Sequence, residues 1–284
     1  MCSRRVPKRY YPRNRSTRIC RTGTARIDRR QNPAFYFSMA LGCGYVHWWF
    51  LAQQSDAAIQ IGIWIYLPFF SDLIAQDPDV GILIIEILPI SMHMTSPPLS
   101  RNASCLAISR ILTSLEISHL TLVSHSFGTV LSTHILHDPI LSPLISSMFF
   151  IDPIPFLLHH PSVAFNFVYR TPRTANEWAL WYFASRDADI ARALSRHFFW
   201  TENILWKEEL AGRRVGVVLS GEDQIVDAEE VRKYLTGERE MSRRWVNDGL
   251  EVLFYPGLDH GTIFDTNERR KPMLDVIHRF VRLH

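Results

Sequence analysis

The stretch HLTLVSHSFGTVLSTHIL, residues 119–136, decides the fold of this chain of 284 residues. Its first half is a continuous apolar run, which predicts a buried strand over residues 120–124. Its second half predicts a helix over residues 128–137. Only three residues separate the two elements, so the sequence predicts a sharp turn with Ser126 at its middle. A turn of this kind lifts the serine oxygen clear of the sheet, and Ser124 and Gly128 are small enough for strand and helix to approach closely.

Outside this stretch, the body of the chain alternates between strand-like and helix-like patterns from residue 59 onward. Such alternation predicts the α/β class, with a mostly parallel sheet covered by helices. The further strands are predicted at 80–88, 148–152, 215–220 and 251–255, and the further helices at 100–116 and about 273–283.

The segment from about residue 153 to 209 interrupts this alternation and is unusually aromatic. A crossover between parallel strands needs only about a dozen residues, so the excess predicts an inserted helical cap. Aromatic residues at helical spacing form a helix core more often than a binding surface. The position of the segment between two predicted strands nevertheless favours a large apolar pocket. Its twelve aromatic residues are Phe156, Phe165, Phe167, Tyr169, Trp178, Trp181, Tyr182, Phe183, Phe198, Phe199, Trp200 and Trp206.

Two polar residues follow later strands in the order that a serine nucleophile requires. Asp223 lies on the loop after the strand 215–220, and His260 lies on the loop after the strand 251–255. A serine hydroxyl needs a base to take its proton. The order serine, acid, histidine along the chain is typical of a fold in which the serine lies on a sharp turn between a strand and a helix. Because the carboxyl ends of parallel strands meet at one edge of a sheet, we expect Ser126, Asp223 and His260 to converge there.

Other assignments of the acid and the base remain open at this point. Glu222, Asp227 or Asp152 could take the role of Asp223, and Asp152 also follows a predicted strand. His260 could be a surface histidine, because the chain contains twelve histidines.

The chain resembles the α/β-hydrolase superfamily, and within it an uncharacterised fungal group of hydrolases. The resemblance rests on SHSFGT around Ser126, SGEDQIV around Asp223, GLDHGTIF around His260 and the cap segment NEWALWYFASRDADIARALSRHFFWTENILW, and it covers roughly residues 61–284. It implies a Ser126–Asp223–His260 triad that acts on an ester, thioester or amide of an apolar small molecule or lipid. It also implies that neither a metal nor an organic cofactor takes part.

One departure from the family pattern concerns the oxyanion hole. Related hydrolases carry a His-Gly pair after an early strand, whereas residues 58–68 offer Gly62 with no histidine before it. We expect the amide of Phe127 to be one donor and the amides around Gly62 and Ile63 to supply the other. If they do not, the chain is a catalytically silent binding protein of the same fold or an incomplete version of an active relative, because losing one donor lowers turnover by about 10²–10³.

The first 56 residues are predicted to be an extension, with the hydrolase domain at 57–284. Residues 1–30 hold eleven of the 31 basic residues and a single acid, Asp28, and residues 35–52 are uncharged. The apolar segment fits three interpretations, namely a membrane anchor, part of a cleaved mitochondrial-type targeting sequence, or a packed or disordered extension. The first would make the chain a membrane-associated protein that contacts lipid through residues 35–52, and in the extreme an interaction protein with a coincidental triad.

Composition excludes several other classes of protein. The basic residues are concentrated in the N-terminal tail and the remainder is acidic overall, so we expect no nucleic-acid partner. The four cysteines show neither zinc-binding nor redox-pair spacing, which favours a reducing, intracellular compartment. They are Cys2, Cys20, Cys43 and Cys105.

Overall fold

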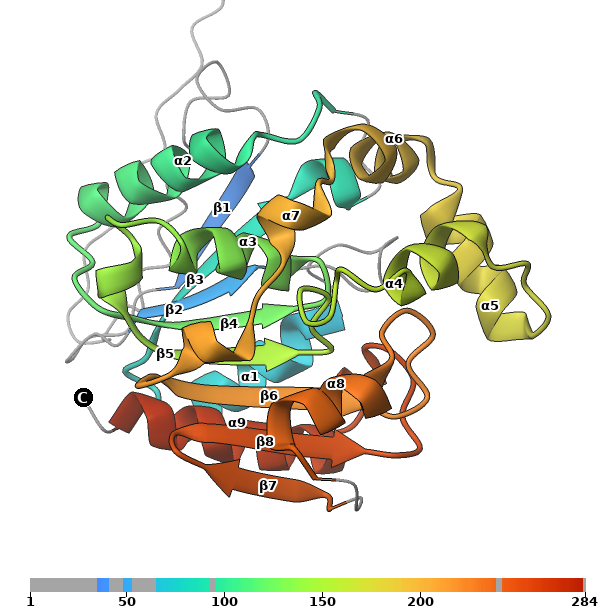
Figure 1. Cartoon of the computed structure of the whole chain (residues 1–284). Coiled ribbons are helices and arrows are strands. Elements are labelled where there is room, and N and C mark those ends of the chain that lie inside the picture. Colours follow the sequence, from blue (N-terminus) through green and yellow to red (C-terminus); the bar gives the residue numbers. More distant parts are fainter. Residues whose placement is uncertain (1–34, 41–47, 53–64, 92–94, 239–241, 283–284) are drawn as a thin grey trace, which may run out of the picture.

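The computed structural model describes residues 35–40, 48–52, 65–91, 95–238 and 242–282, which form an eight-stranded sheet with helices on both faces (Figure 1). The strands are β1 (Phe35–Ala40), β2 (Trp48–Ala52), β3 (Gly81–Ile87), β4 (Leu120–His125), β5 (Ile145–Ile151), β6 (Arg214–Ser220), β7 (Arg244–Asn247) and β8 (Leu250–Tyr255).

The sheet is mostly parallel, which confirms the predicted α/β class. Its strand order is β1-β3-β2-β4-β5-β6-β8-β7. The six inner strands run parallel to one another, and β1 and β7 pair antiparallel at the two edges. Parallel strands are buried on both faces, which is why the predicted strands were recognisable as continuous apolar runs.

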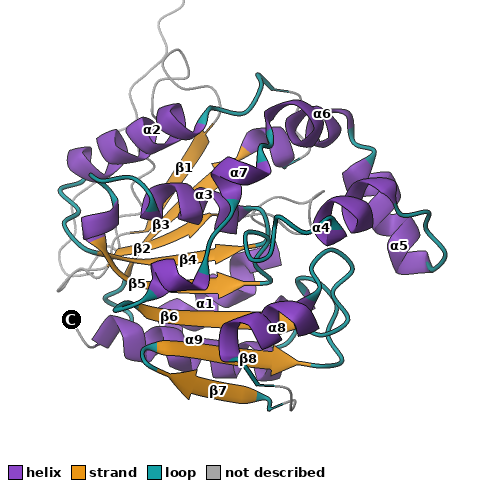
Figure 2. Cartoon of the chain, viewed as in Figure 1, coloured by secondary structure: helices purple, strands orange, loops and turns teal. Residues whose placement is uncertain are grey.

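The helices cover the two faces of the sheet in separate groups, as Figure 2 shows. Helices α1 and α9 pack on one face, and α2, α3 and α8 pack on the other. The helices are α1 (Leu67–Gln76), α2 (Arg101–Ser114), α3 (Gly128–Leu136), α4 (Ser162–Ala164), α5 (Ala175–Leu180), α6 (Ala188–His197), α7 (Trp200–Asn203), α8 (Ala228–Thr236) and α9 (Asn267–Arg282).

Side chains of β5 alternate between these two helical layers. Met148 and Phe150 join the core cluster under α2, α3 and α8, whereas Phe149 and Ile151 join the cluster under α1 and α9. All four are fully buried. Successive residues of a strand point to opposite faces, so one apolar run supplies both cores and fixes the register of the strand.

Residues 153–209 form the predicted insertion. They contribute α4, α5, α6, α7, short π-helical and 3₁₀ segments and loops, with no strand among them. In Figure 1 α4, α5 and α6 project from the side of the molecule at which β4, β5 and β6 end. The cap thus extends over the carboxyl edge of the sheet.

The structure differs from the sequence-based expectation at the N-terminal side. Phe35–Ala40 and Trp48–Ala52 are strands of the main sheet, and β2 lies between β3 and β4. The boundary expected between residues 56 and 57 is therefore wrong, because part of the apolar segment 35–52 belongs to the α/β domain. Within the described ranges, no helix has both the length and the apolar character needed to span a bilayer. Residues 1–34 lie outside the described residues.

The hairpin of β7 and β8 was missed because β7 is short and largely exposed. A sequence signal for it exists in Asp248-Gly249, whose residues adopt φ of 45° and 81°. Two successive positive φ angles characterise a type I′ turn, which favours this dipeptide.

Helix α8 had signals as well: the Asp227 side chain caps its start, and Gly237 ends it in the left-handed conformation. We expected α9 to begin near residue 273, whereas it begins at Asn267.

Gly216 on β6 provides a test of the packing between strands and side chains. A Cβ atom at this position would lie 2.3 Å from the ring of Phe149, whereas one at Gly257 would meet nothing within 4 Å. We predict that Gly216→Ala lowers the free energy of unfolding by about 1–3 kcal/mol, since overpacking a buried site costs that much. Gly257→Ala is the matched control and should leave denaturant unfolding within about 0.5 kcal/mol of wild type. Equal effects of the two substitutions would contradict the packing described here.

Candidate active site

Ser126 occupies the turn between β4 and α3 in a conformation that few residues adopt. Its φ is 51°, in the left-handed region. The turn is held by the Ser126 N–H, which donates to the Ile151 carbonyl at 3.0 Å, and by the Ser126 carbonyl, which accepts from the Thr129 N–H at 2.9 Å. Ser124 and Gly128, which flank the turn, are buried between strand and helix. Backbone strain of this kind persists only where the surroundings impose it.

A chain of two hydrogen bonds runs from Ser126 through His260 to Asp223. The Ser126 Oγ lies 2.8 Å from His260 Nε2, and His260 Nδ1 lies 2.6 Å from Asp223 Oδ2. The side chains of His260 and Asp223 are each 1% exposed. The structure thus brings together three residues that follow β4, β6 and β8, and each arrives from the carboxyl end of its own strand.

The environment of Asp223 fixes the orientation of His260. Asp223 Oδ1 accepts hydrogen bonds from the Ile225 and Val226 N–H groups at 2.7 and 2.9 Å. Burial raises the pKa of the Asp223 carboxyl, and the nearby Asp152 carboxylate raises it further, although His260 and the Val226 N–H act to lower it. With Asp223 ionised, His260 Nδ1–H donates to it, and Nε2 is left to accept the proton of the Ser126 hydroxyl.

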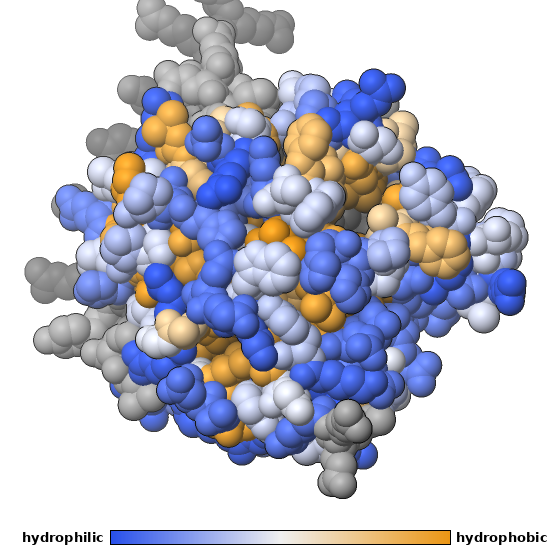
Figure 3. Space-filling model, in the orientation of Figure 1, coloured by the Kyte–Doolittle hydropathy of each residue, from blue (hydrophilic) through white to orange (hydrophobic). Residues whose placement is uncertain are grey.

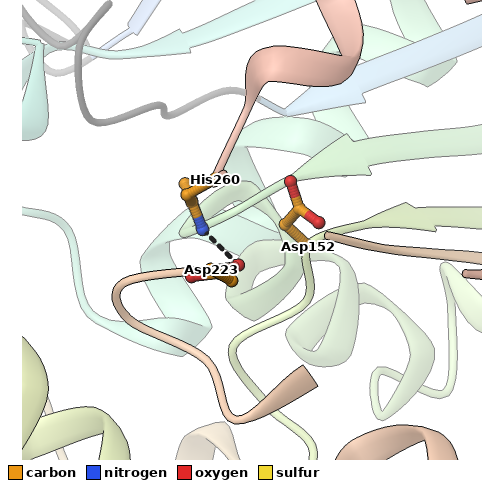
Figure 4. A group of neighbouring side chains, drawn as sticks. All are labelled: Asp152, Asp223 and His260. Atoms are coloured by element: carbon orange, nitrogen blue, oxygen red, sulfur yellow. Dashed lines mark hydrogen bonds and ion pairs between the residues drawn. The ribbon is translucent and has the colours of Figure 1, made fainter. Parts of the chain in front are cut away.

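None of the alternative acids accepts a hydrogen bond from the His260 ring in the part of the chain that the structure describes. Glu222 is exposed to solvent, and Asp227 caps α8 by accepting from the Glu230 N–H at 3.2 Å. Asp152 is fully buried beside Asp223 and His260 and is drawn with them in Figure 4. Of these acids, Asp223 is the one whose carboxylate accepts from His260, as the dashed line in the figure marks.

Asp152, Asp223 and His260 offer ligand atoms within 4.8 Å of one another. Both oxygens of Asp152 accept from protein donors, namely the Ser220 N–H, the Ser220 hydroxyl and the Gly261 N–H. Both oxygens of Asp223 do the same. Donors that point at every carboxylate oxygen fit a hydrogen-bonded acid–base network better than a cation site, which requires free lone pairs.

A cavity of about 500 Å³ lies between Ser126 and the cap. Figure 3 shows apolar side chains, in orange, near the centre of the view and over the cap. The walls of the cavity come from the turn at Ser126, from the start of the cap and from the cap helices, and they are mostly aliphatic and aromatic. They include Phe127, Ile154, Leu158, Phe167, Leu194 and Phe198.

The predicted oxyanion donors Gly62 and Ile63 lie outside the described residues. The residues on either side of that segment both reach the site. Ala52, the last residue of β2, is paired with Ser124 of β4, and the Tyr66 hydroxyl lies 2.8 Å from His125 Nδ1. Phe127 lies directly before α3, where the first N–H groups of a helix have no partner within the helix. Its role as an oxyanion donor stays a prediction.

Sequence reasoning missed three residues that surround Ser126, His260 and Asp223. Thr129 accepts the Ile154 N–H at 3.2 Å and donates to the Ser126 carbonyl, so it joins the turn at Ser126 to the cap. His125 and Tyr66 form a buried pair beneath His260. His125 adjoins Ser126 in the sequence, but nothing in the local pattern indicates which residue contacts it.

The fold is that of the α/β-hydrolases. Solved structures that resemble it include a variant of a meta-cleavage product hydrolase from Pseudomonas fluorescens, with a TM-score of 0.58 and 15% identity over 88% of this chain and 95% of the other. The naproxen esterase of Bacillus subtilis has a TM-score of 0.56 and 14% identity over 92% of each chain. The carboxylesterase CesB of the same organism has a TM-score of 0.55 and 11% identity over 86% and 88%. At these identities the likeness establishes the fold.

No protein-family model matches the sequence. No curated protein matches it either.

The strain at Ser126 predicts a difference in stability between two variants of that residue. Ser126→Ala and Ser126→Gly both lose the hydroxyl, but only glycine adopts a positive φ without steric cost. We expect the glycine variant to be the more stable of the two by about 1 kcal/mol. Denaturant unfolding of both proteins measures this difference. An alanine variant at least as stable as the glycine variant would show that the turn is unstrained.

Proposed function

We propose that this protein is a serine hydrolase that cleaves an ester, or a related thioester or amide, of an apolar small molecule or lipid. The observation that carries the proposal is the unbroken chain from Ser126 Oγ to His260 Nε2 and from His260 Nδ1 to Asp223 Oδ2. A nucleophile, a base and an acid in this arrangement suit acyl transfer irrespective of the fold that carries them.

In the first half-reaction, Ser126 Oγ attacks the carbonyl carbon of the substrate while His260 Nε2 takes the hydroxyl proton. The resulting imidazolium is stabilised by Asp223, which accepts its Nδ1–H. The carbonyl oxygen becomes an oxyanion, for which we propose the Phe127 N–H and the amides around Gly62 and Ile63 as donors. Collapse of the intermediate breaks the bond to the leaving group, which departs with the proton from His260.

In the second half-reaction, water replaces the leaving group. His260 Nε2 takes a proton from the water as its oxygen attacks the acyl carbon bound to Ser126, and it returns that proton to Ser126 Oγ when the acid product leaves. The only groups that change protonation state are Ser126, His260, water and the two products.

The substrate class follows from the cavity beside Ser126. Its walls are mostly apolar, and its volume of about 500 Å³ would hold an acyl chain or an aromatic group of moderate size. Several solved structures of the same fold are described as esterases or hydrolases, which agrees with ester hydrolysis in this chain.

Reaction with a fluorophosphonate probe tests the proposed nucleophile, because only an activated serine reacts with it. We predict stoichiometric labelling of wild type, no labelling of Ser126→Ala, and a rate lowered on the order of 10²–10⁴-fold in Asp223→Asn. Ser195→Ala is the control, since Ser195 lines the same cavity but is not bonded to the histidine. A folded wild-type protein that the probe does not label would instead be a catalytically silent binding protein.

The apolar cavity predicts a preference for longer acyl chains. Phe167 lines the cavity, whereas Phe183 lies on the cap surface and is 39% exposed. We expect Phe167→Ala to reduce kcat/KM for a decanoate ester by about tenfold and for an acetate ester by less than about twofold, because each buried CH₂ contributes about 0.8 kcal/mol. Phe183→Ala should change neither value. Equal losses on acetate and decanoate would exclude the cavity as the acyl site.

A further inference from the structure

A second buried acid lies beside the triad and has no part in the proposed reaction. Asp152 follows β5 directly, is fully buried, and has a φ of 44°. Its N–H donates to the Val218 carbonyl at 2.9 Å, which anchors it between β5 and β6. Non-glycine residues with positive φ are uncommon, and strained residues concentrate at functional sites.

The carboxylate of Asp152 holds the backbone next to His260. Its Oδ2 accepts from the Gly261 N–H at 2.9 Å and from the Ser220 hydroxyl at 3.1 Å, and its Oδ1 accepts from the Ser220 N–H at 2.9 Å. Gly261 directly follows His260, and Ser220 ends the strand that leads to Asp223. One carboxylate therefore connects the two loops that carry the base and the acid.

A buried histidine and tyrosine extend this connection beneath His260. His125 Nε2 lies 3.7 Å from Asp152 Oδ2, and the Tyr66 hydroxyl lies 2.8 Å from His125 Nδ1. The rings of His125 and His260 are tilted with their centroids 5.1 Å apart. All of these side chains are buried. His260 thus rests on a second polar chain that runs from Asp152 to Tyr66.

The titratable groups that face His260 come from four directions. Asp223 lies on the loop after β6, Asp152 after β5 and His125 at the end of β4, and Asp259 on its own loop accepts the His260 N–H at 2.7 Å. Burial acts to raise the pKa of Asp152, but the interactions with His125 and His260 and the Gly261 N–H lower it below its ordinary value. Donors to both of its oxygens, namely the Ser220 N–H, the Ser220 hydroxyl and the Gly261 N–H, suit the carboxylate form of Asp152. A negative charge there favours the protonated form of His260.

We propose that Asp152 is a positioning residue for His260. It fixes the 260–261 backbone through the Gly261 N–H and supplies a second negative charge that stabilises the imidazolium formed when Ser126 attacks. Asp223 orients the ring through Nδ1, and Asp152, supported by His125 and Tyr66, holds the main chain. This inference rests on the proposed hydrolase function.

The test is the pH dependence of kcat/KM for a short ester in Asp152→Asn. One of the two side-chain oxygens becomes an NH₂ group that faces a donor, so we expect kcat to fall by about 10–100-fold while KM changes by less than about twofold. Loss of the negative charge makes the imidazolium less favourable, so His260 stays neutral to lower pH. The acid limb of the profile should therefore move to lower pH by about one unit.

Glu251→Gln is the matched control for loss of a buried negative charge. Glu251 is 5% exposed and bonds to Arg244 and Arg279, away from the triad. We expect it to lower the stability of the protein but to leave the acid limb in place. A merely structural role for Asp152 would give the same pattern in Asp152→Asn, and that result would overturn the proposal.

If Asp152→Asn fails to fold, Tyr66→Phe tests the same chain, because it removes the hydroxyl on His125 and keeps the ring. It should lower kcat by about 3-fold and move the acid limb in the same direction, and an unchanged profile would contradict the proposal.

Fluorophosphonate labelling separates failure of the hydrolase function from failure of the role of Asp152. No labelling of wild type refutes the hydrolase function itself, whereas equal labelling rates for wild type and Asp152→Asn refute only the role of Asp152.

Discussion

The hydrogen bond from the Ser126 N–H to the Ile151 carbonyl is the contact on which the arrangement of the site depends. It ties the turn after β4 to the end of β5, and it helps to hold Ser126 at a φ that its side chain disfavours. The same strand end carries Asp152. The turn at Ser126 and the Asp152 carboxylate are therefore fixed by one junction, and displacement of either would disturb both.

The parallel sheet places the other polar residues of the site beside that junction. β4, β5, β6 and β8 are consecutive neighbours, so the residues that follow them emerge side by side at one edge. Ser126, Asp152, Asp223 and His260 each follow a different one of these strands. Residues that are up to 134 positions apart, as in the pair Ser126 and His260, meet because strand registry places their strand ends together rather than because of any local preference.

The cap supplies the walls of the cavity that the parallel sheet alone does not provide. Some of its aromatic residues, such as Phe167 and Phe198, line the cavity beside Ser126. Tyr169 lines it as well, although the residue is 74% exposed. Others, such as Trp178 and Tyr182, are more than half exposed and lie outside this cavity. The sequence indicated an aromatic cap. It could not assign these roles, because all of these side chains are aromatic and they recur at similar helical spacing.

The sequence by itself determined the parallel strands β3, β4, β5, β6 and β8, the turn at Ser126 and the positions of Asp223 and His260 after their strands. Each of these depends on local pattern: buried apolar runs, small residues beside a turn, and polar residues directly after a strand. Only the tertiary structure decided that β2 lies between β3 and β4 and that Asp223 rather than Asp152 contacts the histidine ring. It alone brought Tyr66 to His125. The physical reason is that strand order and the pairing of buried polar groups depend on which segments, distant in the sequence, share a core. The local pattern of the sequence does not show which segments these are.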